Sequence, residues 1–127
     1  MVRILVIDDD RHMRTACSRV LSKSGWTATC AETGEEGLKE LGCSTQKIDV
    51  VLVDQLMPGI SGEEVLARVR TIDPNLPVVI MTGSATEEST VELKKQGAFD
   101  CLGKPFTPEE LRNVILRAMG KISSDET

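Results

Sequence analysis

Short runs of apolar residues recur along the chain, and several of them end abruptly at a polar residue. The first covers residues 2–7 and stops at Asp8, and the most apolar covers residues 48–54 and ends in Asp54. Both runs are apolar throughout rather than alternating and are rich in β-branched residues, which predicts strands buried on both faces. In all, the pattern predicts five strands, at residues 2–7, 26–30, 48–54, 77–81 and 99–103.

Apolar residues at helical spacing fill the segments between these runs. One predicted helix has its apolar positions at residues 13–21 and is stopped by Gly25. Three others open with a hydroxyl residue followed three positions later by glutamate, which is the capping-box pattern, at Thr33, Ser61 and Thr107. The last of these has proline at its first helical position and the most regular apolar face in the chain.

The segment at residues 87–96 is the weakest predicted helix. Val91 and Leu93 form no clear apolar stripe and two lysines follow them, although Gly97 fits a helix C-terminal cap. Because poor amphipathicity leaves little surface to bury, we expect this helix to have low local stability.

Strands that alternate with helices predict an α/β fold in which helices wrap a parallel sheet. Functional groups in such folds collect beyond the carboxyl ends of the strands. The sequence contains no internal repeat and no internal linker, so we predict one domain over residues 1–120. Residues 121–127 are predicted to be a polar C-terminal tail or the start of a linker.

Composition and charge narrow the class of protein. The chain has 127 residues and a net charge of −5, and it contains no basic cluster, so direct binding to nucleic acid is not expected. No segment approaches the length of a transmembrane span and no signal peptide is visible, which predicts a cytoplasmic protein without membrane contact. The four cysteines form no CxxC pair and are interpreted as reduced thiols rather than zinc ligands.

Polar groups stand at the carboxyl ends of four predicted strands. Asp8 and Asp9 follow the first strand, Asp54 ends the third, Thr82 follows the fourth and Lys104 follows the fifth. These groups would converge at one edge of a parallel sheet, where the carboxylates would repel one another. A Mg²⁺ ion would remove that repulsion and neutralise charge on a phosphoryl group. A carboxylate can accept a phosphoryl group as a nucleophile, and a lysine and a threonine can contact it.

This set of residues resembles the response regulator receiver domains of two-component signalling, the family that includes the chemotaxis regulators. The resemblance extends over essentially the whole chain, and it implies a doubly wound (βα)5, flavodoxin-like, three-layer sandwich with a parallel five-stranded sheet of order 2-1-3-4-5. The matching segments are Asp8-Asp9, Asp54 in VLVDQLMPG, Thr82-Gly83 and Lys104-Pro105-Phe106.

The resemblance also implies a role for each site residue. Asp54 would be the phosphoacceptor, and Thr82 and Lys104 would contact the phosphate. The Lys104–Pro105 bond would be cis. The implied Mg²⁺ ligands are Asp8, Asp9, Asp54 and the backbone carbonyl of Leu56.

Partners follow from the same resemblance. A histidine kinase or a phosphotransfer protein would donate the phosphoryl group, and an output partner or a tethered effector domain, unknown from this sequence, would receive the signal. A phosphorylation-dependent dimer is left open. The domain would be a signalling phosphoacceptor rather than an enzyme, catalysing only its own phosphorylation and dephosphorylation. The helix at residues 87–96, the fifth strand and the last helix would form the surface that changes.

The chain departs from the family pattern at two places. Cys101 stands where the family usually has tyrosine or phenylalanine, so the usual coupling between the threonine and an aromatic ring is in doubt; Phe99, two residues away on the same strand face, is a candidate substitute. Leu56 is apolar at a position beside the phosphate where polar residues are common. Because leucine cannot orient a water molecule, we expect Leu56 and Ser84 together to set the lifetime of the acyl phosphate.

The sequence leaves three alternatives. A haloacid-dehalogenase-type phosphohydrolase also has an Asp-x-Asp after its first strand, as Asp8 to Asp10 do, but His12 and the absence of a later acidic pair disfavour it. A flavodoxin-like or nucleotide-binding module is disfavoured because no GxGxxG or Walker loop follows a strand. A degenerate receiver that acts only as an interaction domain is the third. Asp10 is assigned at most a minor role at the site, and catalysis by His12 is not expected.

Overall fold

The computed structural model of the chain describes residues 1–43 and 46–120, so the predicted tail at residues 121–127 lies outside the described residues. Strands and helices alternate along the chain as predicted. The strands are β1 (Arg3–Ile7), β2 (Thr27–Ala31), β3 (Val50–Asp54), β4 (Val78–Thr82) and β5 (Asp100–Gly103). The helices are α1 (Arg11–Lys23), α2 (Gly34–Cys43), α3 (Gly62–Ile72), α4 (Glu87–Lys95) and α5 (Pro108–Ala118).

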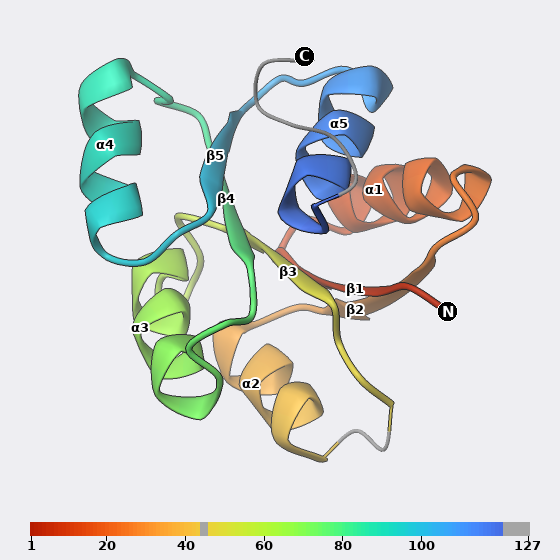
Figure 1. Cartoon of the computed structure of the whole chain (residues 1–127), viewed down its shortest axis with the longest axis horizontal. Coiled ribbons are helices and arrows are strands. Elements are labelled where there is room, and N and C mark those ends of the chain that lie inside the picture. The colour runs from red at the N-terminus through yellow and green to blue at the C-terminus, as the bar shows by residue number, and fades with distance from the viewer. Residues whose placement is uncertain (44–45, 121–127) are drawn as a thin grey trace.

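All neighbouring strands pair in parallel, in the order β2-β1-β3-β4-β5, which confirms the predicted fold (Figure 1). The register aligns the carboxyl ends of the central strands, with Ile7 opposite Val53 and Asp54 opposite Met81. Thr82 in turn stands opposite Gly103. The residues that end these strands therefore meet at one edge of the sheet.

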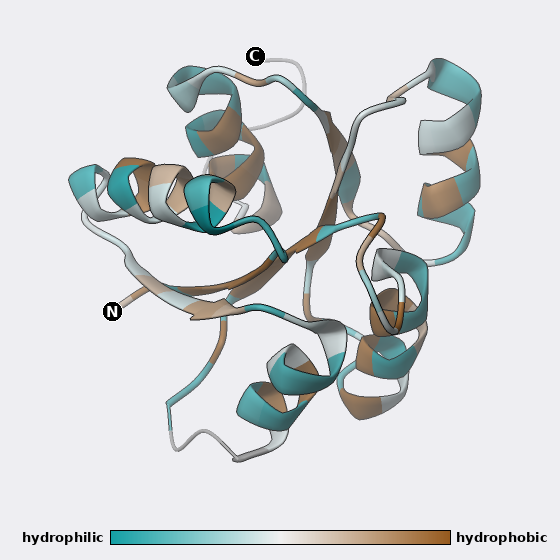
Figure 2. Ribbon diagram, turned by 180° about the vertical axis from the view of Figure 1, so that it is seen from behind, coloured by the Kyte–Doolittle hydropathy of each residue, from teal (hydrophilic) through white to brown (hydrophobic). Residues whose placement is uncertain are grey.

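The sheet separates two apolar layers. Figure 2 shows hydrophobic strands in the interior and hydrophilic helix faces turned outward. Side chains alternate across the strands, so Leu5 and Val51 face the layer beneath α2 and α3, whereas Ile4 and Val50 face the layer beneath α1 and α5. All five residues of β3 and of β4 are buried, as their uninterrupted apolar sequences predicted.

The helix starts follow the predicted capping residues, with differences in detail. At α5 both bonds of the capping box are present, between Thr107 and Glu110. At α3, Ser61 accepts a hydrogen bond from the backbone N–H of Glu64 at 3.2 Å, while the Glu64 carboxylate pairs with Arg68 instead of returning to the cap.

Helix α4 has the sparse packing that the sequence predicted. Leu93 is its only buried residue, and Val91 remains 49% exposed. The helix starts at Glu87 as predicted, but the sequence pattern did not reveal its cap, where Thr86 and Ser89 form a complete capping box with serine in the place of glutamate. Gly97 adopts φ 110° just beyond the helix, which is the left-handed conformation expected for its C-terminal cap.

Candidate functional site

The polar groups at the strand ends converge as predicted. The Lys104 ammonium group lies 3.0 Å from a carboxylate oxygen of Asp54 and 3.3 Å from one of Asp8. The side chain of Asp8 is fully buried, that of Asp54 is 12% exposed and that of Lys104 is 24% exposed. Residues separated by 96 and 50 positions in the chain thus form one ion-pair network at the carboxyl edge of the sheet.

Asp8, Asp9 and Asp54 form the cluster of carboxylates that the sequence predicted. Each offers one oxygen, and these oxygens lie within 4.8 Å of one another. Asp9 is exposed, so one side of the cluster is open to solvent. Oxygen ligands that combine buried and open positions fit a hard divalent cation that keeps part of its water shell, as Mg²⁺ does.

The charges at this edge perturb one another. Burial raises the pKa of Asp8, and the nearby Asp54 carboxylate adds to this rise, although the backbone N–H of Asp10 and the Lys104 ammonium oppose it. Burial alone would lower the pKa of Lys104, but the hydrogen bond to Asp54 and the charges of both carboxylates outweigh burial and raise it. Lys104 is therefore positively charged at neutral pH.

Backbone contacts fix the positions of these side chains. The N–H of Lys104 donates to the carbonyl of Thr82 at 2.8 Å, which extends the pairing of β4 and β5 past the strand end. The Lys104–Pro105 bond is cis, as the resemblance implied. On the other side of the site, Arg14 donates to the backbone carbonyl of Asp8 at 2.9 Å.

Sequence reasoning missed a second network, which starts at Thr82. Its hydroxyl donates to the side-chain carbonyl of Gln55 at 2.5 Å, and the Gln55 amide nitrogen donates to Glu63 at 3.2 Å. The position of Gln55 directly after Asp54 could have indicated that it lies near the site. Nothing in the sequence indicated that Thr82 and Glu63 are its partners. This network joins the site to the first turn of α3.

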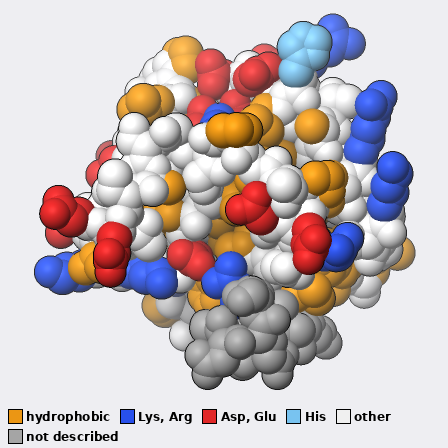
Figure 3. All heavy atoms as spheres, turned by 90° about the horizontal axis from the view of Figure 1, so that it is seen from above, with side chains coloured by type: hydrophobic (Ala, Val, Ile, Leu, Met, Phe, Trp, Pro, Cys, Tyr) orange, Lys and Arg blue, Asp and Glu red, His pale blue; other side chains and the backbone are white. Residues whose placement is uncertain are grey.

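The other residues singled out in the sequence lie around the site in different roles. Leu56 is 79% exposed and Ser84 is also exposed. Asp10 caps α1 by accepting from the backbone N–H of His12 at 2.9 Å and does not belong to the carboxylate cluster. His12 itself is exposed. Figure 3 shows acidic side chains gathered near the histidine.

The suggestion that Phe99 shares the strand face of Cys101 is wrong. Phe99 packs in the layer beneath α1 and α5, whereas Cys101 packs in the opposite layer. The reason is that β5 begins only at Asp100, so the alternation of a strand does not extend back to Phe99. Cys101 instead faces α4, and the Thr90 hydroxyl opposes the rise in the pKa of the Cys101 thiol that burial causes.

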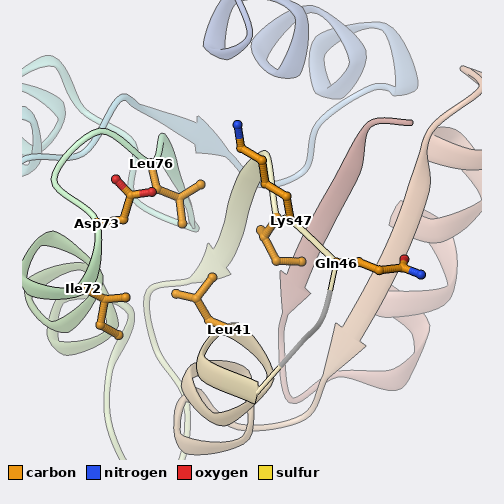
Figure 4. A pocket seen from close by; sticks show the side chains of 7 residues that line it. Leu41, Gln46, Lys47, Ile72, Asp73 and Leu76 are labelled. Atoms are coloured by element: carbon orange, nitrogen blue, oxygen red, sulfur yellow. The ribbon is translucent and has the colours of Figure 1, made fainter.

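A hollow of about 470 Å³ lies at the opposite, amino edge of the sheet (Figure 4). Leu41, Ile72 and Leu76 supply its apolar wall, and Lys47 and Asp73 bring charges to it. Among the residues that the structure describes, the only group of carboxylates suited to a metal ion is the one at the carboxyl edge. A search of those residues also finds no helix with the length and apolarity needed to cross a membrane.

Comparison with known proteins gives a consistent match. Residues 4–116 match the family model of the response regulator receiver domain. The DNA-binding transcriptional regulator NtrC of Escherichia coli strain K12 is 39% identical over 116 residues, covering 91% of this chain and 24% of that protein. The response regulator MprA of Mycobacterium sp. strain KMS is 35% identical over 125 residues, covering 98% of this chain and 54% of that protein. The chain thus spans about a quarter to a half of these relatives.

Solved structures agree with the sequence matches. A response regulator receiver domain protein from Clostridium thermocellum superimposes with a TM-score of 0.88 at 32% identity, covering 95% of this chain and 96% of that one. The chemotaxis protein CheY4 of Vibrio cholerae gives a TM-score of 0.85 at 30% identity, covering 93% and 98%. In both cases the similarity extends over nearly the whole of each chain.

Proposed function

The chain belongs to the response regulator receiver domains, and from this premise we propose that Asp54 is the residue that accepts the phosphoryl group. The observation that carries the proposal is the convergence of Asp8, Asp54 and Lys104 at one edge of the sheet. Membership of this family sets aside the phosphohydrolase and the flavodoxin-like alternatives. A degenerate receiver remains, and it differs from the proposal in one measurable property, the ability to be phosphorylated.

In the proposed reaction, a carboxylate oxygen of Asp54 attacks the phosphorus atom of a phosphohistidine. A P–O bond forms, the P–N bond breaks, and its electron pair stays on the histidine nitrogen, which takes up a proton. Lys104 lies 3.0 Å from Asp54 and is positively charged, so it can pair with the phosphoryl oxygens once the acyl phosphate has formed. Thr82, buried beside Gln55, is the proposed hydroxyl donor to the same group.

The proposed metal ligands are the carboxylates of Asp8, Asp9 and Asp54 and the backbone carbonyl of Leu56. The close spacing of the three carboxylates supports this assignment. A bound Mg²⁺ ion neutralises the charge that develops on the phosphoryl oxygens. Asp8, whose raised pKa reflects the cost of burying its charge, would gain most from the ion.

We propose a histidine kinase or a phosphotransfer protein as donor, and an output partner or a tethered effector domain as receiver of the signal. The matched segment covers only 24% of NtrC and 54% of MprA, which supports an output unit separate from the receiver domain. Residues 1–120 are the proposed receiver, with the tail or linker at residues 121–127, and the cytoplasm is the proposed location. The domain itself is not expected to contact nucleic acid or membrane.

Intact-protein mass spectrometry after incubation with acetyl phosphate tests the central proposal. We expect a single phosphoryl adduct that requires Mg²⁺ and disappears in Asp54→Asn. Asp73→Asn is the matched control, because this exposed aspartate lies at the opposite edge and should leave the adduct unchanged. A folded protein that forms no adduct under any condition would establish the degenerate, interaction-only receiver instead.

The lifetime of the acyl phosphate is proposed to depend on Leu56 and Ser84, both of which are exposed at the site. An asparagine at position 56 can orient an attacking water molecule, so Leu56→Asn should accelerate hydrolysis, and Ser84→Ala should slow it. The decay of the adduct over time measures both rates. The hypothesis is abandoned if neither substitution changes the rate.

Helix α4 is the proposed element that changes on phosphorylation, because it buries only Leu93. An element with few buried contacts opens at low cost and can be biased by a ligand. Amide hydrogen exchange with and without beryllofluoride, a phosphoryl analogue, should change more in α4 than in α5, which buries Leu111, Val114 and Ile115. Equal protection of α4 in the two states would contradict this assignment.

A further inference from the structure

We propose that Gln55 is a positioning residue, which occupies the hydroxyl proton of Thr82 in the unphosphorylated protein and must release it before Thr82 can contact a phosphoryl group. The inference rests on the proposed function, in which Thr82 donates to the phosphoryl oxygen. It adds a second acceptor that competes for the Thr82 hydroxyl proton. This acceptor is the side-chain carbonyl of Gln55, the residue that follows the proposed phosphoacceptor Asp54.

The hydrogen bonds of Thr82 leave no second proton to donate. A threonine hydroxyl has one proton and two lone pairs. Its proton goes to the side-chain carbonyl of Gln55, 2.5 Å away, and the oxygen accepts from the backbone N–H of Ser84 at 3.1 Å. Thr82 is only 3% exposed, so water has little access to replace Gln55. Because phosphoryl oxygens only accept, contact with them requires the bond to Gln55 to break.

Glu63 determines which end of the Gln55 amide faces Thr82. An ionised carboxylate only accepts hydrogen bonds, so the group that faces it must be the amide nitrogen of Gln55, at 3.2 Å. The amide carbonyl is thereby turned toward Thr82. Without Glu63 the amide could rotate and offer its N–H₂ to Thr82, which would leave the hydroxyl proton free.

The start of α3 is held close enough for this contact. A Cβ atom on Gly62 would lie 2.5 Å from the backbone carbonyl oxygen of Asp54, so only glycine allows the approach. The backbone of Gln55 is fixed on both sides, by its N–H to Met81 and its carbonyl to Gly62, each at 2.9 Å. Release of Thr82 can therefore occur through the Gln55 side chain alone, which would change the contact of the site with Glu63.

Removal of the Gln55 amide should strengthen binding of the phosphoryl analogue. A net hydrogen bond of ordinary strength corresponds to a change of about threefold to tenfold in an equilibrium constant. In the presence of Mg²⁺, Gln55→Met should therefore lower the dissociation constant of beryllofluoride by about this factor, as measured by calorimetry. Methionine keeps the length of the side chain and lacks the amide, and Gln55 is partly exposed, so the fold should survive.

A double-mutant cycle with Thr82→Ala separates competition for the hydroxyl from a general structural effect. In the Thr82→Ala background, Gln55→Met should no longer strengthen binding. In the protein with Thr82 intact, the side-chain amide resonances of Gln55 should shift when beryllofluoride binds, and they should shift less in Thr82→Ala. Glu63→Gln should strengthen binding partially, whereas Glu64→Gln, which makes the same charge change one residue further on, should not.

The outcomes distinguish this inference from the proposed function. If the unmodified protein binds no beryllofluoride in the presence of Mg²⁺, the proposed function itself fails. If it binds beryllofluoride and Gln55→Met leaves the affinity unchanged or weaker, the role of Gln55 is wrong while the proposed function stands. Stronger binding that persists in the Thr82→Ala background would also overturn it, because the effect would not pass through Thr82.

Discussion

The two edges of the sheet differ in whether their charged side chains are buried or exposed. At the carboxyl edge, Asp8 is buried with a raised pKa beside Asp54, and the Lys104 ammonium group partly offsets the charges of the two carboxylates. At the amino edge, Leu41 and Leu76 line a hollow whose charged residues, Lys47 and Asp73, are exposed (Figure 4). One edge holds charge where it is costly, and the other follows the ordinary separation of apolar and charged groups.

The central strands that join these two edges do not show this contrast between buried and exposed groups. β3 and β4 are buried along their whole length and consist mainly of valine and isoleucine. The chemistry therefore resides in the residues at the strand ends, and the sheet serves to align them. We expect substitutions at the amino edge to change stability without changing the site. Neutralising a buried charge at the carboxyl edge should instead increase stability and impair function.

The largest expected effect is that of Leu76→Ala at the amino edge. Leu76 is 5% exposed and packs in the layer beneath α2 and α3. Its truncation should lower the free energy of unfolding by about 2–4 kcal/mol, measured by urea denaturation, while the folded protein still forms the Mg²⁺-dependent adduct. Leu56→Ala makes the same change at the carboxyl edge, where leucine is 79% exposed, and should cost less than about 0.5 kcal/mol. Equal costs would break the comparison.

The next effect has the opposite sign and belongs to the carboxyl edge. Burial raises the pKa of Asp8, so its ionised form is unfavourable in the metal-free protein. Asp8→Asn should increase the free energy of unfolding without Mg²⁺ by roughly 1 kcal/mol and should abolish the stabilisation that Mg²⁺ gives. Asp9→Asn is the control, because Asp9 is exposed and its charge costs less. A destabilised Asp8→Asn protein would show that the pair with Lys104 outweighs burial.

The sequence predicted the carboxyl edge well because a parallel sheet turns chain order into spatial order. Once residues 48–54 were recognised as a buried strand, the position of Asp54 at its end followed, and so did its proximity to Asp8 and Lys104. This inference needs only strand direction and register. It does not depend on the conformation of any single side chain.

The features that the sequence did not predict have three different physical causes. The bond between Gln55 and Glu63 requires α3 to approach β3 as closely as Gly62 permits. The capping box of α4 uses Ser89 in place of the glutamate that marks the three capping boxes visible in the sequence. Phe99 was assigned to the wrong face of the sheet because the predicted strand began at residue 99, one residue before β5 begins.

A smaller difference between the two edges is expected in how the free energy of unfolding depends on pH. The folded pKa of Asp8 is raised above its ordinary value of 3.8, so the native protein binds this proton more tightly than the unfolded chain does. The contribution of Asp8 to stability is therefore greatest at low pH, and it falls as pH rises from about 3.8 through the folded pKa. The difference between the unfolding free energies of Asp8→Asn and the unmodified protein, both without Mg²⁺, should grow over that window. A constant difference would contradict it.

The smallest expected effect is the coupling between the two edges, which should be close to zero. They are separated by the length of a five-residue strand, about 16 Å, and effects at that distance are usually additive within about 0.5 kcal/mol. The double variant Asp8→Asn with Leu76→Ala should therefore show the sum of the two single changes in unfolding free energy. A coupling well above that limit would mean that β4 transmits changes along its length. The amino-edge hollow would then have to be counted as part of the site.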